Sequence, residues 1–246
     1  MIVLPMAGLS QRFVKAGYAL PKYMLKAGAD SIFMHVLRSF QNYFAVETFL
    51  FICRNEADTP SFIQAECKKL GIQNIQIVTL GHTTRGQAET VALGLQQMNT
   101  NLGASMTIFN IDTIRAGFKY PPTNILSSID GYLEVFKGKG DNWSFARTHS
   151  ASDATVVETA EKHRISDLCS TGLYDFRHAS DFMDTLHEDS EKPQSEWAAP
   201  ELYVAPLYNN LIQRGKKILA VEIPADQLIP CGIPEEYEAF KRKIEG

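Results

Sequence analysis

The first thirteen residues, MIVLPMAGLSQRF (1–13), decide the fold expected of this chain. Ile2–Pro5 is a short apolar run of the kind that forms a buried strand, and a loop of small residues around Gly8 follows it directly. Small side chains let backbone N–H groups approach a bound anion closely. We therefore predict a first strand that leads into a loop suited to binding phosphate.

Beyond this strand, apolar runs alternate with amphipathic stretches through the first half of the chain. Ser31 can cap one helix, and Gly71 can end another. The predicted strands are 2–5, 48–53, 75–80 and 106–111, and the predicted helices are 31–43, 60–70 and 86–98. Strands that alternate with helices are typical of βαβ units and of a parallel sheet.

The second half has a different pattern, in which short strands follow one another with turn residues between them. The predicted strands are 131–136, 143–148, 154–158, 171–176 and 218–223, and the predicted helices are 179–186, 201–214 and one that starts at Pro234. The polar stretch Asp189–Ser195 is predicted to be a mobile loop. Because no break in composition marks a linker, we predict one α/β domain over residues 1–246, with a Rossmann-like, mainly parallel mixed sheet flanked by helices.

The composition argues against several classes of function. The 24 basic and 28 acidic residues give a net charge of −4, whereas a nucleic-acid partner requires a basic face. No apolar run approaches the roughly 20 residues that cross a bilayer, and the first residues lack the basic start of a signal peptide. The four cysteines, at 53, 67, 169 and 231, have no metal-ligand or disulfide-framework spacing. We therefore expect a cytoplasmic protein with reduced thiols and no nucleic-acid or membrane partner.

Two cations accompany the first loop. Arg12 offers a planar fork for phosphate oxygens, and Lys22, which follows Pro21, offers a movable point charge. The loop is not a Walker loop, and its single glycine does not make a dinucleotide fingerprint, which needs three. From the spacing alone, a plain turn with two surface cations is an equally good interpretation.

Several segments in a fixed order add a resemblance to a known family. Ala7–Phe13 together with Pro21–Lys22 resembles the opening signature of the sugar-nucleotide pyrophosphorylases, which are sugar-1-phosphate nucleotidylyltransferases. The further matching segments are Gly86–Thr90, Asn110–Asp112, Glu161–Lys162 with Ser170–Phe176, and Glu201–Asn209 with Gly232–Glu235. Each segment alone is a weak signal, but the ordered set spans most of the chain.

The resemblance implies a fold of the nucleotide-diphospho-sugar transferase type and a reaction that releases pyrophosphate. A phosphorylated small molecule, most simply a sugar-1-phosphate, would attack the α-phosphate of a nucleoside triphosphate, and the product would serve surface-polysaccharide synthesis. The repulsion between the two polyanions reaches several kcal/mol at an effective dielectric constant of about 20. Catalysis would therefore depend on positioning and on cations. A homo-oligomer is compatible with this function.

The resemblance also implies roles for particular residues. The implied nucleotide-binding residues are Ala7, Gly8, Leu9, Gly86 and Gln87, in a half that ends near residue 115. Arg12 would hold the departing pyrophosphate, Lys22 would neutralise the α-phosphate region, and Asp112 would carry a metal ion. The implied acceptor-binding residues are Glu161, Lys162 and Gly172, in a half that starts near residue 116. A solvated Glu161–Lys162 charge pair and a capping Asp112 are the simpler structural alternatives.

Magnesium is the implied cofactor, because this hard ion prefers a carboxylate together with phosphate oxygens and water. The family usually has a second metal aspartate where this chain has Cys231, and a neutral thiol is a poor ligand for Mg²⁺. Asp226 could substitute if the chain loops suitably. Alternatively, Asp112 and the phosphates hold the metal alone, or activity is weak or lost. Ser10 also departs from the family, since it replaces the usual second glycine of the first loop.

Three other functions are compatible with the same residues. Cys231 motivates a catalytically silent, nucleotide-binding regulatory protein on the same fold. Nucleotidylyl transfer to a non-sugar phosphate, such as a phosphorylated amine, is a close variant. A glycosyltransferase is a weaker alternative, because the chain has Asn110-Ile111-Asp112 where those enzymes usually show Asp-x-Asp. Tyr203 and Tyr208, at helical spacing, are predicted to face the core.

Overall fold

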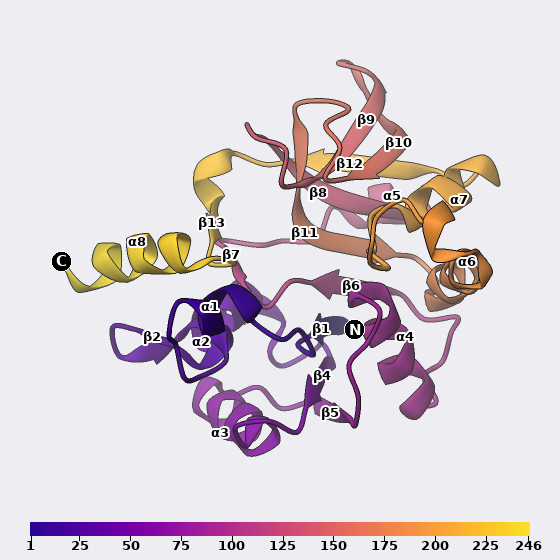
Figure 1. The fold of residues 1–246 in the computed structure, drawn as a ribbon. Coiled ribbons are helices and arrows are strands. Elements are labelled where there is room, and N and C mark those ends of the chain that lie inside the picture. Colours follow the sequence, from indigo (N-terminus) through magenta and orange to yellow (C-terminus); the bar gives the residue numbers. More distant parts are fainter.

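One sheet of nine strands organises the chain, and the computed structural model describes all 246 residues. The strands lie in the order β5-β4-β1-β6-β11-β8-β12-β10-β9 (Figure 1). Their bounds are β1 Ile2–Pro5, β4 Phe49–Arg54, β5 Ile75–Leu80, β6 Met106–Phe109, β8 Gly131–Lys137, β9 Ser144–Ser150, β10 Asp153–Glu161, β11 Leu168–Phe176 and β12 Ile218–Glu222.

The two halves of this sheet differ in strand direction. β1 lies between β4 and β6 and is parallel to both, and β5 extends the parallel set at the edge. β11 runs antiparallel to β6 and β8, and β9 and β10 form an antiparallel pair at the far edge, while β12 is parallel to β8. This arrangement confirms the predicted Rossmann-like mixed sheet, with the parallel strands concentrated in the first half of the chain.

Helices cover both faces of the sheet, because successive strand residues point to opposite faces. Val3 belongs to one apolar core, which is covered by α4 (Gln87–Gln97), α6 (Ala179–Glu191) and α7 (Leu207–Gln213). Ile2 and Leu4 belong to the other core, which is covered by α1 (Gln11–Lys15), α2 (Ile32–Arg38), α3 (Thr59–Leu70) and α8 (Pro234–Glu245). Figure 1 shows the first set of helices on the right and the second on the left.

Local signals placed several helix ends correctly. Ser31 caps α2, and its Oγ accepts a hydrogen bond from Met34 N–H at 3.2 Å. Gly71 ends α3 in the left-handed region, with φ of +74°. Pro234 stands in the first turn of α8, where a missing N–H costs nothing.

Several predicted segments have different bounds in the structure, and three helices differ most. The helix predicted over 31–43 ends at Arg38, and α6 extends to Glu191, into the stretch predicted to be a loop. The helix predicted from residue 201 begins only at Leu207. The residues before it are not helical because their main chain pairs with a distant segment, a contact that no local pattern signals.

Four short strands were not predicted, and two of them pair near the end of β6. β7 (Thr113–Arg115) pairs with β13 (Leu228–Pro230) in an antiparallel ladder. Segments of this length carry no periodicity that distinguishes a strand. Their pairing brings the C-terminal segment beside the end of β6. The remaining short elements are β2 (Lys26–Ala27), β3 (Asp30–Ser31) and α5 (Thr123–Leu126).

The four cysteines are unpaired, as predicted, and all four are buried. None of the helices combines the length and the apolar character that a membrane span needs.

Candidate active site

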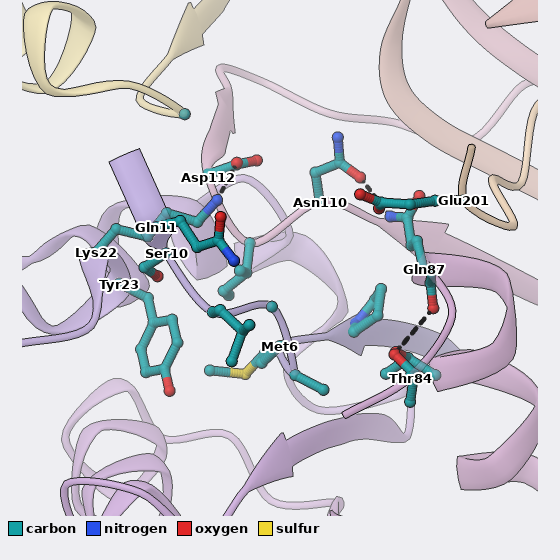
Figure 2. A pocket seen from close by; sticks show the side chains of 18 of the residues that line it. Met6, Ser10, Gln11, Lys22, Tyr23, Thr84, Gln87, Asn110, Asp112 and Glu201 are labelled. Carbon is teal, nitrogen blue, oxygen red and sulfur yellow. Dashed lines mark hydrogen bonds and ion pairs between the residues drawn. The ribbon is translucent and has the colours of Figure 1, made fainter. Parts of the chain in front are cut away.

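A cavity of about 610 Å³ lies where β1 and β6 end. Parallel sheets commonly bind ligands at this edge. The predicted site residues that line the cavity are Ala7, Gly8, Leu9, Arg12, Lys22, Gly86, Gln87, Asp112 and Lys162. Figure 2 shows Lys22 and Asp112 together on one side, and Gln87, Asn110 and Glu201 on the other. The structure therefore brings most of the predicted residues together in one place.

The loop after β1 is shaped by an unusual backbone conformation. Ser10, which immediately precedes α1, has a φ of +49°, in the left-handed region that favours glycine. Its Oγ is buried and has no hydrogen-bond partner. Phe13 packs into the apolar core and holds α1 against it. Ser10 therefore occupies a glycine-type position, which gives a physical reason for the glycine that the family resemblance expects there.

An ion pair between Lys22 and Asp112 stands at one side of the cavity. Lys22 Nζ lies 2.5 Å from Asp112 Oδ2, and the two side chains are 21% and 22% exposed. The carbonyl of Asp112 accepts a hydrogen bond from Cys231 N–H at 2.8 Å. The loops after β1 and β6 and the C-terminal segment thus meet at this pair. Because both side chains are partly exposed, a charged ligand can reach either of them.

Cys231 lies in the same corner but is poorly suited to hold a metal ion. Burial, together with the charges of Asp112 and Glu236, raises the pKa of its thiol to about 12. Gly232 leaves space beside the carboxylate, because a Cβ there would stand 3.1 Å from Asp112 Oδ2. No group of three His, Cys, Asp or Glu side chains that could hold a metal is present in the structure. Asp112 is the carboxylate that lines this side of the cavity, while the neighbouring carboxylate of Glu236 accepts hydrogen bonds from Gly232 and Ile233 N–H.

Gly86 joins two distant segments at the entrance to α4. Its φ is +153°, and a Cβ would stand 2.4 Å from the carbonyl oxygen of Leu202. Leu202 N–H donates to Arg85 O, and Ala88 N–H donates to Leu202 O, both at 2.9 Å. Residues 201–203 therefore form a strap across the start of α4. Any residue other than glycine at position 86 would push this strap away.

Gln87, the first residue of α4, is oriented by Asn110. Gln87 Nε2 donates to Asn110 Oδ1 at 2.6 Å. Gly172 on β11 makes room for this contact, since its φ is +86° and a Cβ there would stand 2.3 Å from Asn110 Nδ2. Gly172 itself does not line the cavity. Gly172 therefore has a structural role, since it leaves the space that Asn110 occupies, and its predicted role toward the acceptor stays a prediction.

Lys162 and Tyr203 form the opposite wall of the cavity. Lys162 adopts φ of +52°, and its Nζ donates to the Tyr203 hydroxyl at 2.5 Å. Burial opposes the charged form of Lys162, but the bond to Tyr203 and the nearby carboxylates outweigh it and raise its pKa. Tyr203 lies in the strap and not on a helix, so the prediction that it faces the core is wrong. Tyr208, in contrast, is fully buried as predicted.

Two predicted site residues lie away from the cavity. Glu161 is buried, and its carboxylate accepts a hydrogen bond from Ser144, while burial raises its pKa. One oxygen of its carboxylate is thus engaged within the fold, and its role toward an acceptor stays a prediction. Asp226 is exposed in a turn just before β13, at the end of the β7–β13 ladder where Leu228 pairs with Arg115. Asp112 lies at the opposite end of this ladder, just before Thr113. Asp226 is thus not placed to share a metal ion with Asp112.

Among the cavity residues that were missing from the predicted site, three lie on the side formed by Gln87 and Lys162. These are Asn110, Glu201 and Tyr203. Each falls inside a segment that carries the family resemblance, so the resemblance contained a signal for all of them. Helical spacing obscured that signal for Tyr203, because the strap mimics a helix in its pattern of apolar residues.

Solved structures similar to this chain share its fold over almost the whole length. A nucleoside-diphosphate-sugar pyrophosphorylase from Vibrio cholerae RC9 is 50% identical, with a TM-score of 0.93, over 98% of this chain and 100% of that one. A protein from Bacillus anthracis assigned as a glucose-1-phosphate thymidylyltransferase is 15% identical, with a TM-score of 0.76, over 99% and 94% of the two chains. A UDP-glucose pyrophosphorylase complexed with UDP-glucose is 14% identical, with a TM-score of 0.74, over 98% and 97%. No family model and no curated protein sequence matches the chain.

The fold and the cavity define a protein of the nucleotidyltransferase type, as the sequence predicts. The two distant likenesses establish the fold alone. Because 50% of the aligned residues are identical to those of the Vibrio protein over both full lengths, the chain belongs to the nucleoside-diphosphate-sugar pyrophosphorylase family.

Proposed function

We propose that this protein transfers a nucleotidyl group from a nucleoside triphosphate to a sugar-1-phosphate and releases pyrophosphate. The observation that carries the proposal is the meeting of Arg12, Lys22 and Asp112 with Lys162 and Tyr203 around one cavity. The names of the similar structures, which are sugar-nucleotide pyrophosphorylases and a thymidylyltransferase, support the same reaction class.

The reaction requires two polyanions to approach each other. In the proposed arrangement, a phosphate oxygen of the acceptor attacks the α-phosphate in line, and the bond to the pyrophosphate breaks as the new bond forms. Arg12 and Lys22 neutralise the triphosphate side, and Lys162 holds the acceptor phosphate. Preorganised cations of this kind stabilise the charge that develops in the transition state. No protein nucleophile is required.

Magnesium is part of the proposal, and the residues at Asp112 fit it. Asp112 would hold the ion together with phosphate oxygens and water, and Gly232 leaves space beside its carboxylate. When bound, Mg²⁺ would supply positive charge to the phosphates of the nucleotide. Lys22, which now pairs with Asp112, would then be free to contact a phosphate.

The finer features of the prediction remain proposals. Residues up to about 115 would bind the nucleotide, and the rest of the single domain would bind the acceptor. The protein would act in the cytoplasm, and its product would be used in surface-polysaccharide synthesis. Assembly into a homo-oligomer is compatible with this function.

Pyrophosphate release tests the proposed reaction. The four ribonucleoside triphosphates and dTTP are each combined with a panel of sugar-1-phosphates and phosphorylated amines, with and without Mg²⁺. We expect release that requires one nucleotide, one sugar-1-phosphate and the metal. Asp112→Asn should reduce the rate and weaken its dependence on Mg²⁺, whereas the matched variant Asp226→Asn should change neither. Absence of release with every combination would overturn the proposal.

A catalytically silent nucleotide-binding protein is the second candidate, and Cys231 is the observation that favours it. In this case the wild-type protein binds a nucleotide, seen as a rise in melting temperature, without turnover. Cys231→Asp would then create turnover or raise it strongly. If wild-type turnover is already substantial and Cys231→Asp lowers it, the silent interpretation is excluded.

A further inference from the structure

A second cavity, of about 190 Å³, lies at the opposite end of the sheet. Met1 and Ser105, which stand just before β1 and β6, help to line it. Thr107 on β6 lines this cavity, and Asn110, three residues further on, lines the active-site cavity. At about 3.3 Å per residue, roughly 10 Å of chain separates the two. The second cavity is therefore independent of the proposed catalytic function.

Its polar groups come from an otherwise apolar face of the sheet. Asp175 on β11 is in register with Thr107 on β6 and with Tyr132 on β8, so the three residues are cross-strand neighbours. Asp175 is only 8% exposed and Tyr132 only 1%. The hydroxyl of Tyr132 has no hydrogen-bond partner and does not line the cavity. A carboxylate in such surroundings costs free energy unless donors or a cation reach it.

The hydrogen bonds leave an acceptor unfilled. Thr107 donates its hydroxyl proton to Asp175 Oδ2 at 2.7 Å. Because a hydroxyl has one proton, the bond of 3.0 Å between Thr107 and Tyr120 must be donated by Tyr120. No protein group donates to the second oxygen of Asp175. The unfilled capacity of this cavity is therefore that of an acceptor, and it selects a ligand with N–H or O–H donors.

The cations near the cavity are already engaged. The terminal ammonium of Met1 lies 3.1 Å from a carboxylate oxygen of Glu47. Arg177 Nη1 donates to the carbonyls of Ser127 and Ile129. Burial raises the pKa of Asp175 to about 7, against the opposing effects of the Thr107 hydrogen bond and the terminal ammonium. Asp175 is thus charged in a large share of molecules near neutral pH without a cation in contact.

We propose that this second cavity binds a small alkylammonium ion, with its nitrogen on Asp175. Its apolar body would lie against Leu126, Ile129 and Gly131, which line the same cavity. A positive donor offsets the charge of the buried carboxylate, which a neutral alcohol of the same shape does not. The size of the cavity admits only a short chain.

The test uses n-butylammonium chloride as the probe at pH 8, with n-butanol and sodium chloride as matched controls. Binding to the ¹⁵N-labelled full chain is followed by NMR. We expect saturable shifts at the amides of Thr107, Gly131 and Asp175, and none from either control. Asp175→Asn should weaken binding by about tenfold or more, as expected for a lost charge-assisted hydrogen bond. The exposed variant Asp141→Asn should bind as the wild type does.

Two results would overturn this assignment. One is an absence of saturable shifts at these amides in the wild type. The other is an equal response of wild type and Asp175→Asn, or of butylammonium and butanol, because the cavity would then be merely apolar. A nucleotide that fills the active site should leave the shifts intact, which separates this outcome from any failure of the proposed transferase activity.

Discussion

The two ends of the sheet differ in how they expose and pair a carboxylate. Asp112, where β6 leads into the active-site cavity, is 22% exposed and pairs with Lys22 at 2.5 Å. Asp175, at the other end of the sheet, is 8% exposed, and its carboxylate accepts a single hydrogen bond, from Thr107. Asp112 is therefore paired with a cation and accessible to a ligand. Asp175 instead carries an uncompensated desolvation cost that a ligand or a proton can relieve.

The ends also differ in backbone strain. At the active-site end, Ser10 and Lys162 have φ values of +49° and +52°, and Gly86 has φ of +153°. Each position is unfavourable for ordinary residues, by about 1–3 kcal/mol. At the other end, Asn99 also has a positive φ, but asparagine tolerates this conformation. The cost at the active-site end therefore lies mainly in the backbone, and the cost at the other end lies mainly in one buried carboxylate. The predictions below, from the largest expected effect to the smallest, test this contrast.

Asp175→Asn should stabilise the protein at alkaline pH. The pKa of Asp175 is raised from 3.8 in its ordinary state to about 7 in the folded protein. The folded protein therefore loses stability relative to the unfolded chain as the pH rises between these values. At 1.36 kcal/mol per pH unit, the free energy of unfolding of the variant should exceed that of the wild type by up to about 4 kcal/mol above pH 7. Below pH 4 the two should agree. The carboxamide retains an acceptor for Thr107.

Urea unfolding at several pH values measures this difference. The groups that face Asp175 and could blur the profile are the Met1 ammonium, Glu47, Tyr120 and Tyr132. The charge of Asp175 contributes to the raised pKa of both tyrosines, but burial is the larger cause, so both stay neutral at pH 8 in the variant. The exposed Asp141→Asn serves as control and should show no pH-dependent gain. A variant that is equally or less stable at pH 8 would show that the Asp175 end carries no electrostatic cost.

Lys22→Ala should lower turnover by about 10²–10³-fold, because it removes a fixed cation from the proposed transition state. Nucleotide affinity should fall much less, since the charge matters most as the α-phosphate is attacked. Steady-state rates of pyrophosphate release, compared with nucleotide binding, separate the two effects. Lys15→Ala, an exposed cation in the last turn of α1, is the matched control. If turnover falls equally in Lys22→Ala and Lys15→Ala, Lys22 contributes only to the general electrostatic potential and has no specific role at the α-phosphate.

Gly86→Ala tests whether the strain at the active-site end serves the strap. The added Cβ would meet the backbone of Leu202, which must move together with Glu201 and Tyr203. At about 1–3 kcal/mol of strain, we expect the KM for the acceptor to rise by roughly tenfold. The KM for the nucleotide should change less. If instead the KM for the nucleotide rises more than the KM for the acceptor, Gly86 has the nucleotide-binding role that the sequence resemblance implies.

The residues that could be predicted from the sequence share one property. Gly8, Arg12 and Asp112 follow directly after apolar strands, and the end of a strand places its successors at the sheet edge where ligands bind. The roles of Arg12, Lys22 and Asp112 were implied by the family resemblance, which selected them among the residues of these loops. Their positions depend on local order along the chain, which a single sequence contains.

The residues that were missed or misassigned depend on distant contacts. Tyr203 reaches the cavity because Leu202 pairs with residues more than a hundred positions earlier, which overrides a pattern typical of a helix. Gly172 is required by Asn110, a neighbour across strands and not along the chain. Asp226 failed as a second carboxylate because an unpredicted two-strand ladder separates it from Asp112. Such pairings are decided by the packing of the sheet and not by local sequence.

Ser10→Gly is the smallest of the expected effects. Glycine adopts the left-handed region without the 1–2 kcal/mol that another residue loses there, but it also gives up about 0.5–1 kcal/mol more conformational entropy on folding. The substitution also removes a buried hydroxyl that has no partner. We therefore expect a gain of about 1 kcal/mol in the free energy of unfolding, measured by urea titration, with Ser10→Ala as the matched variant that keeps the strain. If Ser10→Gly is more stable but binds the nucleotide more weakly than Ser10→Ala, the strained backbone is what holds the ligand. If both variants bind weakly, the hydroxyl itself is the contact, and the orphaned Oγ of the free protein is a donor kept in place for a phosphate.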